Sequence, residues 1–178
     1  MMVDLSHLKI LLVDDSLHMR RIVRSLLNGL GIRDIAEAED GAVALQLFEE
    51  SVPDIVISDW VMPVFDGLEL TRAIRNADSA NPYTSIIMMT GHTERSKVLQ
   101  ARDAGVTEFL VKPMSAKSLF ARISNCLENP RPFVKTKSYF GPDRRRFVHP
   151  SYQGERKRRA DVNLAEEIAL DKQVENAI

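Results

Sequence analysis

The chain has 178 residues, of which 44% are hydrophobic and 28% are charged, and its formal net charge is -1. This length and composition fit one domain of ordinary size with a shorter segment attached, and they leave no room for a second large domain. The single Cys126 excludes an intramolecular disulfide, and no apolar run approaches the roughly 20 residues of a membrane span.

Up to Glu128, short apolar runs alternate with longer amphipathic stretches, a pattern typical of a parallel sheet wrapped by helices. Five strands are predicted, over residues 9–13, 34–38, 54–58, 85–89 and 108–111. Apolar and β-branched residues dominate the first, third and fourth of these strands, as expected for strands that are buried on both faces.

The predicted helices between the strands are defined by their start and stop signals. Ser16 can cap a helix that runs to about Leu30 and ends before Gly31. The other helices are expected over about 42–50, after Gly67, over about 93–104, and from 115 onwards. This (βα)5 order predicts the α/β class, with a doubly wound five-stranded parallel sheet whose sites lie at the carboxyl ends of the strands.

Three acidic residues follow strands that are neighbours in such a sheet. Asp14 and Asp15 come after the first strand and Asp59 after the third, and their mutual repulsion favours a hard cation such as Mg2+. Thr90 and Lys112 end the fourth and fifth strands at the same edge. Solvated loop acids are the alternative, but the added hydroxyl and ammonium favour an oxyanion beside a metal, as phosphoryl transfer requires.

These residues belong to motifs that occur in a fixed order along the chain. The motifs are Asp14-Asp15, Asp59-Trp60-Val61-Met62-Pro63, Asp66-Gly67, Thr90-Gly91 and Lys112-Pro113. In them the chain resembles CheY-like receiver domains of response regulators, over about residues 8–128. The resemblance implies a two-component phosphorelay protein that receives its phosphoryl group from a sensor histidine kinase or a phosphotransfer protein. It also implies no enzymatic activity beyond the chain's own phosphorylation and dephosphorylation.

The resemblance assigns a role to each residue of the acidic pocket. Asp59 is the expected phosphoacceptor, and its carboxylate is the nucleophile. Mg2+ is expected on Asp15, Asp59 and the backbone carbonyl of Val61, with Asp14 bound through water. Lys112 is expected to pair with a phosphoryl oxygen or with Asp59.

A second group of residues is expected to bind the phosphoryl group and to switch: Thr90, Gly91, Phe109, Lys112 and Pro113. After transfer, the Thr90 hydroxyl is expected to move to a phosphoryl oxygen and leave space that an aromatic side chain fills. Phe109 lies at the position of that aromatic, where the family often has Tyr. Phe109 is interpreted either as this switch residue or as a strand residue half in the core, and Trp60 either as a partner contact or as rim packing.

The composition changes after Glu128, where the domain of residues 1–128 is expected to end. Residues 129–138 are predicted to be a Pro-containing linker, residues 139–160 an irregular arginine-rich segment, and residues 161–178 a short helix. Residues 131–159 hold 10 Lys and Arg against 2 acidic residues, whereas residues 1–129 hold 13 against 18. An anionic partner is therefore expected at this basic C-terminal extension.

The arginine-rich segment has the chemistry of a guanine-nucleotide site, because arginine forks match phosphate and guanine, and an Asp can accept from guanine donors. It resembles the C-terminal extension of Cle-type CheY-like regulators, which implies binding of cyclic di-GMP and action on the flagellar motor or attachment machinery. The residues assigned to the nucleotide are Tyr139, Phe140, Asp143, Arg144, Arg145, Arg146, Glu155, Arg156, Arg158 and Arg159.

Other interpretations of the extension stay open. It is too short for a DNA-binding domain and lacks a helix-turn-helix pattern. A basic tail could instead dock on the acidic surface of the domain, bind nucleic acid non-specifically through phosphates, or dock a protein partner. Polar residues at positions 4, 6 and 7 come too early for a secretory signal, so a cytoplasmic location is expected.

Overall fold

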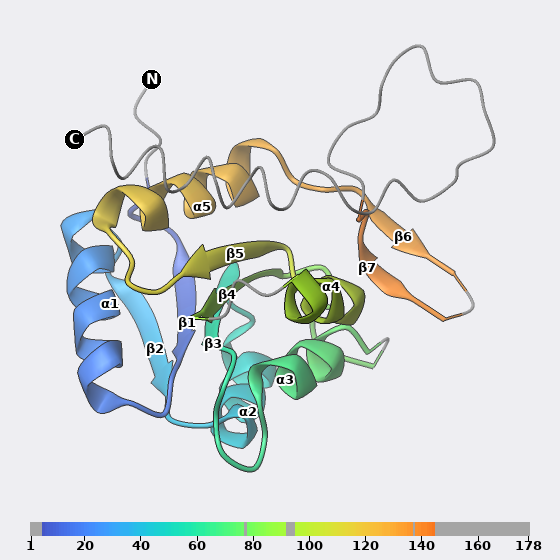
Figure 1. The fold of residues 1–178 in the computed structure, drawn as a ribbon. Coiled ribbons are helices and arrows are strands. Elements are labelled where there is room, and N and C mark those ends of the chain that lie inside the picture. Colours follow the sequence, from blue (N-terminus) through green and yellow to red (C-terminus); the bar gives the residue numbers. More distant parts are fainter. Residues whose placement is uncertain (1–4, 77, 92–94, 137, 145–178) are drawn as a thin grey trace.

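The computed structural model describes residues 5–76, 78–91, 95–136 and 138–144. Five parallel strands form one sheet in the order β2-β1-β3-β4-β5 (Figure 1). They are β1 (Lys9–Val13), β2 (Asp34–Ala38), β3 (Ile55–Asp59), β4 (Ser85–Thr90) and β5 (Glu108–Val111). The predicted five-stranded parallel α/β sheet is confirmed. Two strands reach one residue further than predicted, so that Asp59 and Thr90 are the last residues of β3 and β4.

Five helices connect and cover the strands. They are α1 (Leu17–Gly29), α2 (Gly41–Ser51), α3 (Gly67–Ile74), α4 (Arg95–Ala104) and α5 (Ala116–Glu128). The predicted cap of α1 is confirmed, since the Ser16 hydroxyl accepts a hydrogen bond from the Met19 amide at 3.3 Å. Gly31 and Gly105 follow helices with φ of 92° and 104°, a left-handed conformation that glycine adopts without a steric cost.

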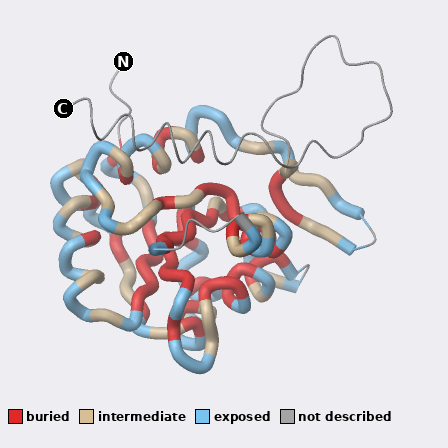
Figure 2. Tube along the Cα trace, viewed as in Figure 1, coloured by how far each residue is buried: buried red, intermediate tan, exposed pale blue. Residues whose placement is uncertain are grey.

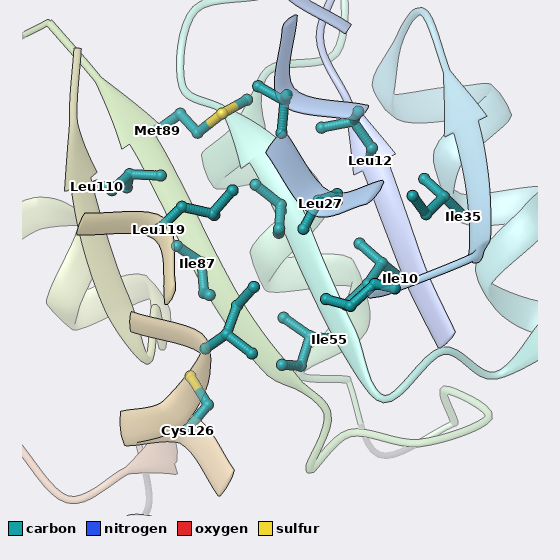
Figure 3. Close-up of a cluster of buried hydrophobic side chains, with 14 of the residues drawn as sticks. Ile10, Leu12, Leu27, Ile35, Ile55, Ile87, Met89, Leu110, Leu119 and Cys126 are labelled. Atoms are coloured by element: carbon teal, nitrogen blue, oxygen red, sulfur yellow. The ribbon is translucent and has the colours of Figure 1, made fainter. Parts of the chain in front are cut away.

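The strands carry two separate apolar layers because successive side chains point to opposite faces of the sheet. One layer packs under α1 and α5, where Leu27 and Leu119 belong to the same cluster as Leu12 and Ile55 (Figure 3). The other layer packs under α2 and α3, and it contains Phe48. Figure 2 shows the result, with the strands buried between helices whose outer surfaces are exposed.

A third, smaller cluster lies beneath α4 and settles the interpretation of Trp60. The indole is only 6% exposed and packs with Met88, Ala101 and Ala104, so Trp60 is a core residue here. Cys126 on α5 is also buried, and burial raises the pKa of its thiol to about 12, as fits a small core residue.

The start of the C-terminal extension differs from the sequence prediction. Residues 129–138 were expected to be a linker, and no strand pattern is apparent from 133 onwards. The structure instead contains a two-stranded antiparallel sheet, β6 (Phe133–Lys135) with β7 (Phe140–Pro142), beside α4 (Figure 1). Strands of three residues are too short to show an alternating pattern, and their packing partner Tyr83 is about 50 positions away in the sequence.

The described part of the chain contains no helix with the length and apolar character needed to cross a membrane.

Candidate functional site

The predicted site residues meet at the carboxyl edge of the sheet. Asp59 is the last residue of β3, Thr90 is the last of β4, and Lys112 follows β5 directly. The Lys112 amide donates to the Thr90 carbonyl at 2.8 Å, so β4 and β5 stay paired up to the site. Asp14 follows β1, and its amide donates to the carbonyl of Ala38 at the end of β2 at 3.2 Å. Continued pairing therefore fixes the backbone on both sides of the pocket.

The three carboxylates converge as predicted. One oxygen from each of Asp14, Asp15 and Asp59 lies within 4.8 Å of the other two. Lys112 reaches into the group, with its Nζ 3.1 Å from Asp14 Oδ2 and 2.9 Å from Asp59 Oδ1. Asp15 is exposed, whereas the Asp14 side chain is fully buried and that of Asp59 is 13% exposed. The pocket thus has a buried floor and one acid that faces solvent.

The charges of the pocket are not balanced, because three carboxylates face one ammonium. Burial raises the pKa of Asp59, and the nearby Asp14 charge adds to this, although the hydrogen bond and charge of Lys112 oppose it. Burial alone would lower the pKa of Lys112, but its contacts with Asp59 and Asp14 outweigh burial and raise it. An additional cation would relieve the surplus negative charge.

This arrangement fits a magnesium site. Hard divalent cations bind carboxylate oxygens, and three such oxygens lie close enough together to share one ion. The backbone amide of Ser16 donates to Asp14 Oδ1 at 2.9 Å and holds that carboxylate in place. Sequence reasoning missed this contact because a backbone donor leaves no mark in the residue pattern.

The floor of the pocket depends on Gly67, the first residue of α3. Its amide donates to the Trp60 carbonyl at 3.0 Å, which holds the start of α3 against the end of β3. A Cβ atom at Gly67 would lie 2.2 Å from the carbonyl oxygen of Asp59, a distance that no side chain tolerates. The glycine of the Asp66-Gly67 motif is therefore required by close approach to the backbone of the predicted phosphoacceptor.

The predicted switch residues surround the same pocket. Thr90 is buried, and Phe109 is half-buried and packs against the Trp60 cluster beneath α4. The structure thus confirms the half-core position of Phe109, while its switching role stays a prediction. Gly91 is exposed, and no atom of the described residues lies within 4 Å of where a Cβ would be. Pro113 follows Lys112 through a cis peptide bond.

Val61 and the neighbouring Val64 are exposed residues between β3 and α3. Val61 is 59% exposed, and the assignment of its backbone carbonyl to Mg2+ stays a prediction. Val64 is fully exposed with a φ of 66°. Together with Asp15, Asp40 and Phe65, Val64 lines a cavity of about 330 Å³ beside the acidic pocket.

Only part of the predicted nucleotide site lies within the described residues. Tyr139 and Phe140 belong to the hairpin, where Phe140 packs on Tyr83 at 5.4 Å between ring centroids. Arg144 stacks over the Tyr139 ring, with its guanidinium carbon 3.8 Å from the centroid. The Asp143 amide donates to the Pro132 carbonyl at 2.7 Å. The remaining predicted residues, Arg145, Arg146, Glu155, Arg156, Arg158 and Arg159, lie outside the described residues, as does the predicted helix at 161–178.

Comparison with known proteins identifies the family of the domain. The family of response regulator receiver domains matches residues 10–124. The chain is 39% identical over 121 residues to the chemotaxis protein CheY of Pseudomonas aeruginosa, a match that covers 68% of this chain and 97% of that protein. It is 34% identical to the solved chemotaxis protein CheY4 of Vibrio cholerae, with a TM-score of 0.62 over 66% of this chain and 97% of that one. A putative response regulator from Chloroflexus aurantiacus is 28% identical, with a TM-score of 0.64 over 68% of this chain and 98% of that chain. The carboxylate cluster, the sheet and these matches together show that the chain belongs to the CheY-like response-regulator receiver domains of two-component signalling.

Proposed function

We propose that this receiver accepts a phosphoryl group on Asp59 from the phosphohistidine of a sensor histidine kinase or a phosphotransfer protein. The observation that carries the proposal is the position of the Asp59 carboxylate. It is the one acid of the pocket that lies at the end of a central strand, close to two further acids, and in contact with the Lys112 ammonium at 2.9 Å. That combination suits a nucleophile for phosphoryl transfer.

In the proposed reaction, an oxygen of Asp59 attacks the phosphorus atom as the bond from phosphorus to the donor imidazole nitrogen breaks. The products are an acyl phosphate on Asp59 and the free imidazole of the donor. Lys112 already contacts Asp59 and Asp14, so its ammonium is placed to offset the charge that the phosphoryl oxygens bring. Asp15, Asp59 and the Val61 carbonyl would hold Mg2+, with Asp14 bound through water, and the ion supplies further positive charge beside the phosphoryl group.

The proposed output is contact with protein partners, and the chain acts on no substrate other than its own phosphoryl group. Phosphorylation replaces the single charge of the carboxylate with the larger charge of a phosphoryl group, and it adds strong acceptors that the buried Thr90 hydroxyl would bond. Phe109 packs against the cluster beneath α4, so a shift of Thr90 and Phe109 would reach the surface of that helix. Its relatives are named chemotaxis proteins, which supports a target in the flagellar motor.

Phosphorylation of the purified chain tests this proposal. The wild type, Asp59→Asn and Asp34→Asn would each be incubated with phosphoramidate and Mg2+, and the phosphorylated fraction measured by intact mass. Asp34 is exposed on β2, away from the pocket, and its replacement removes the same charge. We expect phosphorylation of the wild type and of Asp34→Asn, and none of Asp59→Asn. A phosphorylated Asp59→Asn protein would place the acceptor elsewhere.

A second function, binding of cyclic di-GMP by the extension, is favoured by the Tyr139 and Arg144 pair. The guanidinium already stacks on an aromatic ring at 3.8 Å, so this arginine is in part ordered before any ligand arrives. A guanidinium fork binds phosphate oxygens or the O6 and N7 edge of guanine, both of which a cyclic dinucleotide offers. Docking of a protein partner and non-specific binding of nucleic acid are the competing possibilities.

Calorimetric titration separates these possibilities. Cyclic di-GMP would be added to the full chain and to a variant with Arg144, Arg145 and Arg146 changed to Ala, with cyclic di-AMP as the matched control ligand. We expect saturable binding of cyclic di-GMP that the triple variant loses and cyclic di-AMP does not reproduce. Equal binding of both nucleotides, with a steep dependence on salt, would indicate a non-specific phosphate interaction instead.

A further inference from the structure

The first described part of the extension is attached to the receiver domain at several points. We call residues 131–144 the strap. At its start, Arg131 Nη2 lies 3.2 Å from the carboxylate of Glu108, which is almost fully buried at the beginning of β5. In its middle, the Phe133 ring packs on Tyr83 at 5.0 Å between centroids and lies under the guanidinium of Arg75 at 5.1 Å. The strap is thus docked on the amino edge of the sheet, away from Asp59.

The strap closes on itself before the arginine-rich segment continues. The Asp143 amide donates to the Pro132 carbonyl at 2.7 Å, and the Thr136 amide donates to the Tyr139 carbonyl at 2.8 Å. The Tyr139 hydroxyl donates to the Pro142 carbonyl at 2.7 Å. These bonds fix the place at which the first arginine of the segment, Arg144, leaves the hairpin.

Arg144 then makes a contact with the receiver domain itself. Its Nη1 lies 2.8 Å from Oδ1 of Asp103, a residue of α4. One face of the guanidinium is covered by the Tyr139 ring. Its Nε is buried and has no hydrogen-bond partner among the described residues. The charge of Arg144 is therefore already paired with a carboxylate that belongs to the folded domain.

We propose that the ion pair between Asp103 and Arg144 is an autoinhibitory contact, which an anionic ligand of Arg144 must open. The proposal rests on the proposed nucleotide binding in one respect, because cyclic di-GMP is the anion that would compete. The Asp103 carboxylate competes with a phosphate for the donors of Nη1 of Arg144, and the two negative groups repel each other. Asp103 thus lowers the affinity of Arg144 for anions and holds the strap against α4.

The size of the effect is limited by solvent. The Asp103 side chain is 52% exposed, and ion pairs of this kind contribute little because water and salt screen them. Removing the carboxylate is therefore expected to tighten anion binding by about twofold to fivefold.

The test compares Asp103→Asn with Asp34→Asn in the full chain. Both variants lose one carboxylate from an exposed position. Asp34 lies on β2, which is the outer strand on the other side of the sheet from β5. Two quantities would be measured: the amide hydrogen exchange of Thr136 and Asp143 without nucleotide, and the calorimetric affinity for cyclic di-GMP. We expect faster exchange and a two- to fivefold lower Kd in Asp103→Asn, and no change in Asp34→Asn.

The two measurements separate the possible failures. Unchanged exchange in Asp103→Asn would overturn the contact, whatever the nucleotide does. Weaker nucleotide binding in that variant would make Asp103 part of the ligand site. An unchanged Kd would show that Asp103 does not compete with the nucleotide. Either result overturns autoinhibition. If neither the wild type nor the two variants bind cyclic di-GMP, the proposed nucleotide binding is wrong, and so is its autoinhibition. Faster amide exchange in Asp103→Asn would still establish that Asp103 holds the strap on α4.

Discussion

The two edges of the sheet both bury charged groups, but they treat those charges in opposite ways. At the carboxyl edge, three acids share a single lysine, and burial raises the pKa of Asp59. At the amino edge, the buried Arg75 donates to the carbonyls of Gly105 at 3.0 Å and of Pro82 and Thr84, each at 2.8 Å. The carboxyl edge is short of positive charge. At the amino edge, Nε and Nη1 of Arg75 donate to these backbone carbonyls.

The difference separates a reactive site from a structural one. Burial lowers the pKa of Arg75 to about 9, yet the residue remains charged at neutral pH and its donors are met by backbone carbonyls. The buried Glu108 nearby is likewise met by Arg122, Asn125 and Arg131. An incompletely neutralised cluster such as the acidic pocket attracts a cation, whereas the amino edge holds the loops and the strap in place.

Loss of Arg75 is the largest effect that we expect. Arg75→Met keeps much of the side-chain volume but leaves two buried carbonyls and one part-buried carbonyl without their donor, at a cost of about 3 kcal/mol in the free energy of unfolding. Arg72→Met, at an exposed position of α3, the helix that Arg75 follows, is the control and should cost less than about 0.5 kcal/mol. Urea unfolding of both variants measures the difference, and equal stabilities would contradict a structural role for Arg75.

The sequence predicted the carboxyl edge far better than the amino edge, and the reason is physical. Asp14, Asp59 and Lys112 each follow an apolar strand directly, so strand prediction alone brings them together. Arg75 and Glu108 are charged residues whose burial depends on partners up to about 30 positions away, and no local pattern marks them. The hairpin was missed for the same reason, since Phe133 and Phe140 pack on Tyr83, which is distant in the sequence.

At the carboxyl edge, the largest expected effect comes from Gly67→Ala. The added Cβ would lie 2.2 Å from the Asp59 carbonyl oxygen and 3.0 Å from Met88 Sδ, so α3 must shift away from β3. We expect a loss of about 2 kcal/mol in the free energy of unfolding together with slower phosphorylation of Asp59. Denaturant unfolding and the phosphoramidate assay measure the two consequences, and wild-type values in both would show that the close approach is not required.

Replacement of Asp59, the proposed phosphoacceptor, should stabilise the fold rather than destabilise it. Because the folded-state pKa of Asp59 is raised, its contribution to stability is full below the unfolded pKa and is lost as the pH rises through the folded one. At pH 7 the buried carboxylate therefore opposes folding. We expect Asp59→Asn to raise the free energy of unfolding by about 1 kcal/mol in the absence of divalent cations. Mg2+ should stabilise the wild type more than the variant and so reduce the difference between their free energies of unfolding.

Thermal unfolding at pH 7, with and without Mg2+, measures both quantities. Asp34→Asn is again the control, because its carboxylate lies at an exposed position of β2 outside the cluster. If Asp59→Asn were less stable than the wild type without metal, the three acids would not be in excess over their cation. The comparison between an unbalanced and a balanced edge would then fail.

The smallest effect on stability is expected at Gly91, where one substitution can separate a requirement for folding from a requirement for phosphoryl transfer. Within the described part of the chain, a Cβ at this position meets no atom within 4 Å, and Gly91 is not among the residues with positive φ. Gly91→Ala should therefore change the free energy of unfolding by less than about 0.5 kcal/mol. If the small residue at position 91 leaves room for the phosphoryl group, Asp59 of this variant should be phosphorylated more slowly than that of the wild type. The reason is that the added methyl would crowd only the phosphorylated state. Normal stability with a normal rate would remove Gly91 from the phosphate-binding residues, whereas a loss of stability would mean that the fold itself requires this glycine.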